Sequence, residues 1–207
     1  MQSRHIKKVF FAEKVFYVSE DVYEPAEDSF LFAETLSINS GDVVLDMGTG
    51  CGILGIIAAE RASEVIAIDI NPYAVQCAKE NAKINNAANK MFFIQGDLFT
   101  PLQIRRIFDL ILFNAPYLPI ESMEKTAWVE YAWSGGLNGR QVIDCFICEA
   151  PKYLKKSGRV LMMQSTLSGV DETLWKFERC GLKSKIITEC SMPFFEKLVL
   201  FEAKWKL

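Results

Sequence analysis

Short apolar runs alternate with segments of helical pattern from residue 43 to residue 180, and this alternation limits the fold more than any other feature. Strands and helices in strict alternation are typical of a mostly parallel sheet with helices on both faces. The sequence therefore predicts an α/β fold with a doubly wound sheet. Pro151 is expected to kink or split the helix expected at 141–156. The expected strands are 43–47, 65–68, 91–94, 108–113 and 159–163, and the expected helices are 53–62, 72–85, 141–156 and 170–180.

The two ends of the chain depart from this alternation. Residues 8–18 form two short apolar runs around a polar turn, which predicts an N-terminal β-hairpin. The runs 184–190 and 197–203 have six residues between them, too few for a helical crossover, so we expect them to pair antiparallel. No linker or repeat interrupts the chain. We predict one domain over residues 1–207, with no separate recognition domain.

The composition excludes several classes of protein. A net charge of −3 and a pI near 5.4 argue against a dedicated nucleic-acid-binding protein, which usually carries a basic surface. No segment approaches the ~18 apolar residues that span a bilayer, and the N-terminus lacks the pattern of a signal peptide. We therefore expect a cytoplasmic protein.

The six cysteines are scattered, and the single histidine, His5, lies near the N-terminus. Cys145 and Cys148 form a Cys-x-x-Cys pair, but this pair lies in a segment of helical pattern and has no second pair to complete a zinc site. We predict that the protein binds no metal and that its cysteines are small buried thiols.

Three glycines, Gly48, Gly50 and Gly52, separate the strand at 43–47 from the next expected helix. Glycine lets the backbone turn tightly and lets a ligand approach closely, and open α/β sheets bind ligands at this edge. We expect all three glycines of this glycine loop (residues 46–52) to contact a cofactor. The dinucleotide fingerprint requires a glycine where this chain has Ile53, which disfavours a nicotinamide cofactor.

An aspartate stands at the end of each of the first three parallel strands expected after residue 43. Asp69 is placed to bind a ribose diol, and Asp97 to accept from an adenine amino group while the Leu98 N–H donates to the ring. Asp46 is placed to hold an ammonium group. Three carboxylates would repel a pyrophosphate, so together they indicate S-adenosyl-L-methionine, although each aspartate alone is more often a cap or turn residue.

The strand at 108–113 runs directly into Asn114-Ala115-Pro116-Tyr117, which we call the acceptor turn. The side-chain oxygen of Asn114 and the carbonyl of Ala115 can accept the hydrogens of a planar NH₂ group. Pro116 stiffens the turn and Tyr117 offers a flat face. The turn thus suits an amide or an aromatic amine. The segment 118–138 that follows carries three large aromatic residues, and we expect it to serve function or to cover a sheet edge.

With these motifs in this order, the chain resembles the class I SAM-dependent methyltransferases, a Rossmann-like fold of seven strands. It is most similar to the HemK/PrmC-type protein-glutamine N5-methyltransferases in their short archaeal and eukaryotic form, through residues 22–29 and 132–140. The resemblance implies that the acceptor turn binds the substrate amide. It implies cofactor contacts at Ser29, Asp46, Gly48, Asp69, Asp97 and Leu98.

The resemblance also implies a substrate and a partner. The family substrate is the glutamine of a Gly-Gly-Gln motif in a peptide-chain release factor, and the short forms need a small zinc-binding activator subunit. We expect the strand at Met91–Ile94 to lie at the edge of the sheet and to dock this activator. The alternative is that the chain's own helices cover this strand.

One residue departs from the family pattern Asn-Pro-Pro-Tyr: Ala115 replaces the first proline, which adds an N–H and is expected to loosen the turn. Two other functions stay open. An N6-adenine methyltransferase acting on DNA or RNA uses the same planar NH₂ chemistry, but the acidic pI and the lack of a target-recognition domain disfavour it. The other is a SAM-binding scaffold without activity, for which Ala115 would be the trace of lost catalysis.

Overall fold

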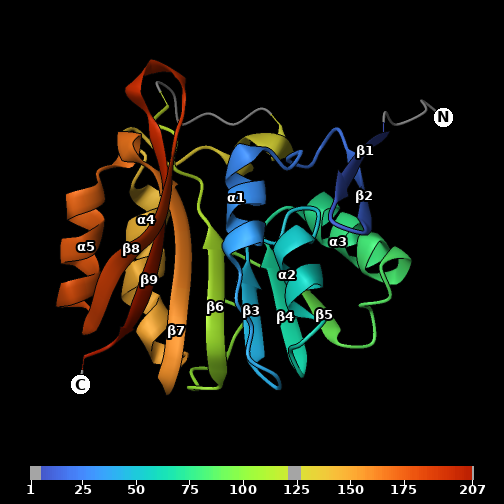
Figure 1. The fold of residues 1–207 in the computed structure, drawn as a ribbon, viewed down its shortest axis with the longest axis horizontal. Coiled ribbons are helices and arrows are strands. Elements are labelled where there is room, and N and C mark those ends of the chain that lie inside the picture. The colour runs from blue at the N-terminus through green and yellow to red at the C-terminus, as the bar shows by residue number, and fades with distance from the viewer. Residues whose placement is uncertain (1–5, 121–126, 207) are drawn as a thin grey trace.

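The computed structural model describes residues 6–120 and 127–206, so His5 and part of the segment 118–138 lie outside the described residues. A seven-stranded sheet runs through the molecule in the order β5-β4-β3-β6-β7-β9-β8 (Figure 1). The first five of these strands are parallel, and β9 pairs antiparallel with β7 and β8. The strands are β3 Val43–Met47, β4 Glu64–Asp69, β5 Met91–Gln95, β6 Phe108–Asn114, β7 Leu154–Ser165, β8 Leu182–Ser191 and β9 Lys197–Trp205. The expected α/β fold with an antiparallel C-terminal pair is confirmed.

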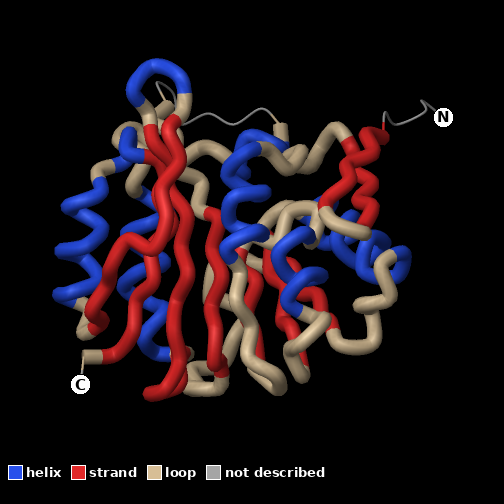
Figure 2. The backbone as a smooth tube through the Cα atoms, in the orientation of Figure 1, coloured by secondary structure: helices blue, strands red, loops and turns tan. Residues whose placement is uncertain are grey.

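Five α-helices cover the two faces of this sheet within the described part of the chain (Figure 2). Side chains of α1, α2 and α3 pack in one apolar layer, which contains Phe32 and Leu54. Side chains of α4 and α5 pack in the second layer, which contains Phe146 and Phe177. The helices are α1 Glu27–Thr35, α2 Ile53–Ala58, α3 Pro72–Ile84, α4 Gln141–Glu149 and α5 Val170–Arg179. No helix within the described ranges is long and apolar enough to cross a membrane.

The expected N-terminal hairpin is present as β1 (Ile6–Phe11) and β2 (Lys14–Ser19). Asn81 of α3 and Asn85, which caps the C-terminus of α3, bind its free edge. The Asn81 amide accepts from the Tyr17 N–H at 2.9 Å and donates to the Tyr17 carbonyl at 3.0 Å, and Asn85 bonds both main-chain groups of Val15 in the same way. These side chains bind main-chain groups of β2 that a third strand would otherwise bind. They hold the hairpin over the first core layer.

The helix expected over 141–156 is shorter than predicted. α4 ends at Glu149, one 3₁₀ turn containing Pro151 follows, and β7 begins at Leu154. Pro151 lacks the N–H that would continue the helix. The Tyr153 carbonyl then accepts from the main-chain N–H groups of residues 107 and 108. The segment that begins at Leu154 therefore pairs with β6 as a strand, although its local pattern predicts a helix.

The expectation of buried thiols holds for two cysteines only. Cys51 and Cys77 are buried, whereas Cys145 and Cys148 are exposed. The pair lies on the outer side of α4, because the inner side carries the buried apolar residues such as Phe146. Within the described residues, no group of three or more His, Cys, Asp or Glu side chains is placed to hold a metal.

Strand β5 lies at the edge of the sheet, as expected. The chain forms turns and no helix over residues 96–107, between β5 and β6. The face that carries α4 and α5 elsewhere therefore has no helix over β5. Ile94 packs into the second core layer, but Phe92, two residues earlier on the same face, is 52% exposed. This edge is thus an apolar surface that the described chain leaves partly uncovered.

Candidate active site

A cavity of about 450 Å³ opens at the carboxyl ends of the parallel strands. Most of the residues expected from the sequence line it, and four do not. Those on its wall are Ser29, Gly48, Gly50, Asp69, Asp97, Leu98, Asn114 and Pro116. Asp46, Gly52, Ala115 and Tyr117 are absent from the wall. Eight of the twelve residues predicted from the sequence thus lie on one cavity wall, and the other four lie off it.

The three glycines of the glycine loop have two different surroundings, the cavity wall and the protein core. Gly48 and Gly50 have φ values of +65° and +56° and line the cavity with main chain alone. Gly52 also has a positive φ of +88°, but a Cβ there would lie 3.1 Å from the Cβ of Ala78 in α3. The third glycine therefore lets α2 and α3 pack closely, and the first two leave the cavity wall free of side chains.

Asp46 lies beneath the glycine loop and is 1% exposed. Its Oδ2 accepts from Thr49 Oγ1 at 2.6 Å and from the Gly55 N–H at 3.0 Å. Burial raises the pKa of this carboxyl to about 7, against the two hydrogen bonds, and the nearby charge of Asp69 adds to the rise. The structure thus places Asp46 as a brace of the loop.

Gly55 is a site residue that the sequence reasoning missed. A Cβ at this position would lie 2.7 Å from Asp46 Oδ2 and 2.8 Å from Met91 Cε, so only glycine leaves room for the carboxylate. The available signal was a glycine inside a short helical segment, where it costs about 1 kcal/mol relative to alanine and so needs a packing reason.

Asp69 joins the end of β4 to the glycine loop. One carboxylate oxygen accepts from the Gly50 N–H at 2.9 Å, and the other accepts from the Asn71 N–H at 2.9 Å. Burial raises the pKa of Asp69, and these main-chain bonds oppose the rise. A carboxylate on the cavity wall offers acceptor oxygens that suit a pair of neighbouring hydroxyls.

The segment after β5 shapes the far wall. Leu98 has a φ of +45°, a left-handed conformation that non-glycine residues seldom adopt. The Asp97 carbonyl, which accepts from the main chain and the hydroxyl of Thr100, holds the turn in this form. Such strain of about 1–3 kcal/mol persists where surrounding structure imposes it and is common at binding sites. It places an exposed carboxylate and an apolar side chain together on the wall.

Asn114 is fixed at the end of β6 by two acceptors. Its Nδ2 donates to Asp28 Oδ2 at 3.1 Å and to Ser29 Oγ at 3.3 Å, which determines the orientation of the amide. The Asn114 Oδ1 is buried and has no hydrogen-bond partner among residues 6–120 and 127–206. An unpaired buried acceptor is costly, and its position on the wall suits a ligand N–H.

Asp28 organises this side of the cavity and was not expected from single motifs. Besides Asn114, its carboxylate accepts from the Tyr117 hydroxyl at 3.2 Å, the Tyr23 hydroxyl at 3.2 Å and the Ser29 N–H at 2.6 Å. Burial and the Asp28 charge raise the pKa of both tyrosines, so both phenols stay protonated donors. The signal was the stretch 22–29, in which only Ser29 was expected to act.

Ala115 makes a main-chain hydrogen bond that a proline at this position could not make. Its N–H, which a proline would lack, donates to the Met163 carbonyl at 3.2 Å. This bond extends the β6–β7 pairing one residue past Asn114.

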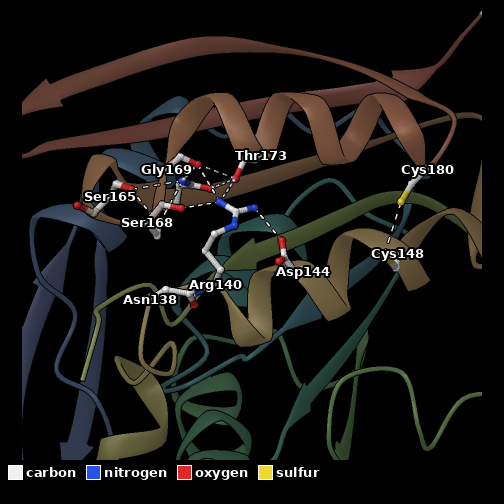
Figure 3. A network of polar contacts seen from close by, with 10 residues as sticks. Asn138, Arg140, Asp144, Cys148, Ser165, Ser168, Gly169, Thr173 and Cys180 are labelled. Carbon is white, nitrogen blue, oxygen red and sulfur yellow. Dashed lines mark hydrogen bonds and ion pairs between the residues drawn. The ribbon is translucent and has the colours of Figure 1, made fainter. Parts of the chain in front are cut away.

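The stretch 132–140 begins on the cavity wall, with Ala132 and Ser134, and ends at Arg140 outside it. The Arg140 guanidinium donates to the Gly169 carbonyl at 2.8 Å, to Thr173 Oγ1 at 3.1 Å and to Asp144 Oδ1 at 2.7 Å (Figure 3). This network ties the start of α4 to the connection between β7 and α5. Of the aromatic residues in the preceding loop, Trp128 and Tyr131 line the cavity.

Known proteins are similar to this chain in sequence and in fold. The sequence profile of the ribosomal protein L11 methyltransferase family (PrmA) matches residues 29–137. A putative protein N5-glutamine methyltransferase of Methanocaldococcus jannaschii is 43% identical over 189 residues, which cover 90% of this chain and 93% of that protein. The chain belongs to the HemK-type protein N5-glutamine methyltransferases. Its cofactor is therefore S-adenosyl-L-methionine.

Two solved structures agree with this membership at the level of the fold. E. cuniculi Mtq2, in the Mtq2–Trm112 complex responsible for methylation of the translation termination factor eRF1, has a TM-score of 0.70 and 22% identity over 90% of this chain and 99% of that chain. M. jannaschii TYW2 in complex with AdoMet has a TM-score of 0.71 and 16% identity over 100% of this chain and 88% of that chain. This N5-glutamine methyltransferase therefore has the class I methyltransferase fold.

Proposed function

We propose that this methyltransferase modifies the side-chain amide nitrogen of the glutamine in the Gly-Gly-Gln motif of a peptide-chain release factor. The observation that carries the proposal is the buried Oδ1 of Asn114, which has no hydrogen-bond donor among the described residues and belongs to a residue that lines the cavity. A glutamine amide supplies that donor. The likeness to Mtq2, whose complex methylates a termination factor, supports the choice of protein substrate.

The wall of the cavity suits the cofactor residue by residue. Asp69 would take the ribose hydroxyls, and Asp97 with the Leu98 N–H would take the adenine. Gly48 and Gly50 leave room for the amino-acid part, because no side chain projects from them. Asp46 and Gly52 contribute by holding the loop, and Ser29 approaches from α1 beside Asn114. When bound, the cofactor supplies a methyl group on a sulfonium that needs no further activation.

The acceptor side must make a poor nucleophile react, because an amide nitrogen shares its lone pair with its carbonyl. Asn114 Oδ1 and the Ala115 carbonyl would accept the two amide hydrogens and stabilise the positive charge that develops on nitrogen. Asp28 holds Asn114 so that Oδ1, and not the NH₂ group, faces the substrate. Orientation of this kind can supply up to about 7–11 kcal/mol of the barrier. Tyr117 and Pro116 keep the turn in place.

The test is methyl transfer from radiolabelled cofactor to a purified release factor, with and without the activator subunit. The expected product carries one methyl group on the glutamine of the Gly-Gly-Gln motif, located by mass spectrometry. Asn114→Ala should abolish turnover while cofactor affinity stays nearly unchanged. Full activity of that variant, label in DNA or RNA instead of protein, or no label in any acceptor would contradict the proposal, and the last result would favour a SAM-binding scaffold.

We also propose that a small zinc-binding activator subunit docks on the β5 edge. β5 has a partner strand on one side only within the described residues, and Phe92 on its uncovered face is 52% exposed. An edge of this kind invites pairing with another chain. Mtq2, which has a similar fold, occurs in complex with Trm112.

A charge on this edge tests the docking. Phe92→Lys should abolish co-purification of the activator and improve the solubility of the chain alone. Phe10→Lys is the matched control, since Phe10 is 66% exposed on the N-terminal hairpin and lies outside β5. Equal activator binding by both variants would reject the β5 edge as the docking surface.

A further inference from the structure

The hairpin between β8 and β9 ends in two phenylalanines that are fully exposed within the described part of the chain. Phe194 and Phe195, here called the aromatic tip, are 97% and 104% exposed. Both have left-handed backbone conformations, with φ of +60° and +64°. The Met192 N–H donates to the Glu196 carbonyl at 2.8 Å, which closes the turn and holds this strained form. A soluble chain rarely combines strain with two bare aromatic rings unless the surface binds something.

The aromatic tip lies at the same end of the sheet as the cavity. β6 ends at Asn114 and β7 runs parallel to it, and the end of β7 pairs with the start of β9 through Ser165 and Leu198 (Figure 1). The hairpin therefore projects past the carboxyl ends of the central strands.

The base of the hairpin adjoins the acceptor turn. Met192 packs against the same core layer as Tyr117. Glu196 is close enough to Tyr117 for its charge to contribute to the raised pKa of that phenol. The Lys197 N–H donates to Thr166 Oγ1 just after β7, which fixes the hairpin at its root. The base of the hairpin that carries the aromatic tip thus lies beside Tyr117 of the acceptor turn.

We propose that the aromatic tip binds an apolar surface of the protein substrate while the acceptor glutamine lies against Asn114. This inference rests on the proposed function. The reacting amide belongs to a protein, so the chain on either side of the glutamine must cross the rim next to the acceptor turn. The aromatic tip is the apolar surface that meets it there, and aromatic side chains with a fixed backbone are effective anchors in interfaces.

The test removes the rings and keeps the backbone. In the double variant Phe194→Asn/Phe195→Asn, asparagine tolerates the left-handed conformation and presents no apolar surface. The KM for the release factor should rise by about tenfold, while kcat at saturating release factor and the affinity for S-adenosyl-L-methionine stay unchanged. Ile104→Asn is the matched control, because Ile104 is 68% exposed and precedes β6 at the opposite end of the sheet.

The outcomes separate this inference from the proposed function. Suppose that the unaltered enzyme methylates the release factor and that the double variant has the same KM. This result overturns substrate binding by the aromatic tip and leaves the proposed function intact. An unaltered enzyme that methylates no release factor overturns both. If the double variant keeps its KM but no longer self-associates in sedimentation, the aromatic tip is a contact between two copies of the chain. If it keeps its KM but no longer binds the activator, the aromatic tip is part of the activator's docking surface. Either result overturns substrate binding.

Discussion

At the scale of single residues, the acceptor side of the cavity depends on a carboxylate outside the acceptor turn. Asp28 accepts hydrogen bonds from Asn114, Tyr117 and Tyr23 while it is itself buried. Buried carboxylates are stable only when such donors surround them. The orientation of Asn114, and with it the free Oδ1, follows from this arrangement.

We predict that Asp28→Asn lowers kcat by about 10²-fold. The NH₂ group of the new amide would face the NH₂ group of Asn114, and this repulsion between two donors would shift the acceptor turn. The free energy of unfolding should fall by about 2 kcal/mol as charge-assisted bonds are lost. Steady-state kinetics and urea denaturation measure the two effects. Glu27→Gln, at the exposed neighbouring position, should leave both quantities unchanged. A variant with normal kcat would show that Asp28 does not position Asn114.

The raised pKa of Asp46 implies that the free energy of unfolding depends on pH. Burial raises its pKa from 3.8 to about 7 in the folded protein, so the folded protein keeps a proton that the unfolded chain has lost. The free energy of unfolding should therefore fall as pH rises from about 4 to about 7, by an amount on the order of 4 kcal/mol. Asp46→Asn cannot lose this proton. Denaturation at several pH values should show the advantage of the unaltered protein over the variant shrinking as pH rises. Asp69, whose pKa is also raised, is present in both proteins and cancels. Parallel pH profiles would contradict the assignment.

At the scale of elements, the glycine loop contains two kinds of glycine that the sequence cannot tell apart. Gly50 has only one atom as close as 4.0 Å to a Cβ built on it, whereas a Cβ at Gly52 would press on Ala78 of α3. Their positive φ values impose a similar backbone cost on any replacement, so the difference between them comes from their neighbours.

We predict opposite outcomes for two alanine variants of this loop. Gly50→Ala should raise the Kd for S-adenosyl-L-methionine and cost only about 1–2 kcal/mol of stability from the backbone conformation. Gly52→Ala should cost about 1–3 kcal/mol more, because the added methyl overpacks the contact between α2 and α3. Calorimetric titration and thermal denaturation separate the two effects. Equal stability of the two variants would refute the division.

At the scale of the whole molecule, the charge distinguishes a protein substrate from a nucleic acid. The chain carries a net charge of −3, and affinity for DNA or RNA depends on basic groups that displace counterions. We predict that excess duplex DNA or transfer RNA at low salt neither binds in a gel-shift assay nor slows methylation of a release factor. Salt-sensitive binding with competitive inhibition would favour an adenine methyltransferase instead.

Local pattern was sufficient for much of the fold. β3 has the residues that its apolar run predicted, and α3 begins at Pro72 with Asn71 accepting from the Tyr73 N–H, because caps and apolar runs act over a few residues. The prediction failed for residues 141–156, where pairing of β7 with β6 overrides the helical pattern. It failed also for the exposed Cys145 and Cys148, since which face of a helix meets solvent is decided by the element packed against it.

The sequence by itself determined the order of strands and helices, the glycine loop at the end of β3 and Asn114 at the end of β6, since each depends on spacing within a short segment. Tertiary structure alone decided that Asp28 meets Asn114 across 86 residues, that Asp46 lies beneath the loop and that Gly52 faces α3. The physical reason is distance along the chain. Spacing fixes where a residue stands on its own element, whereas the packing of elements fixes which residue it meets.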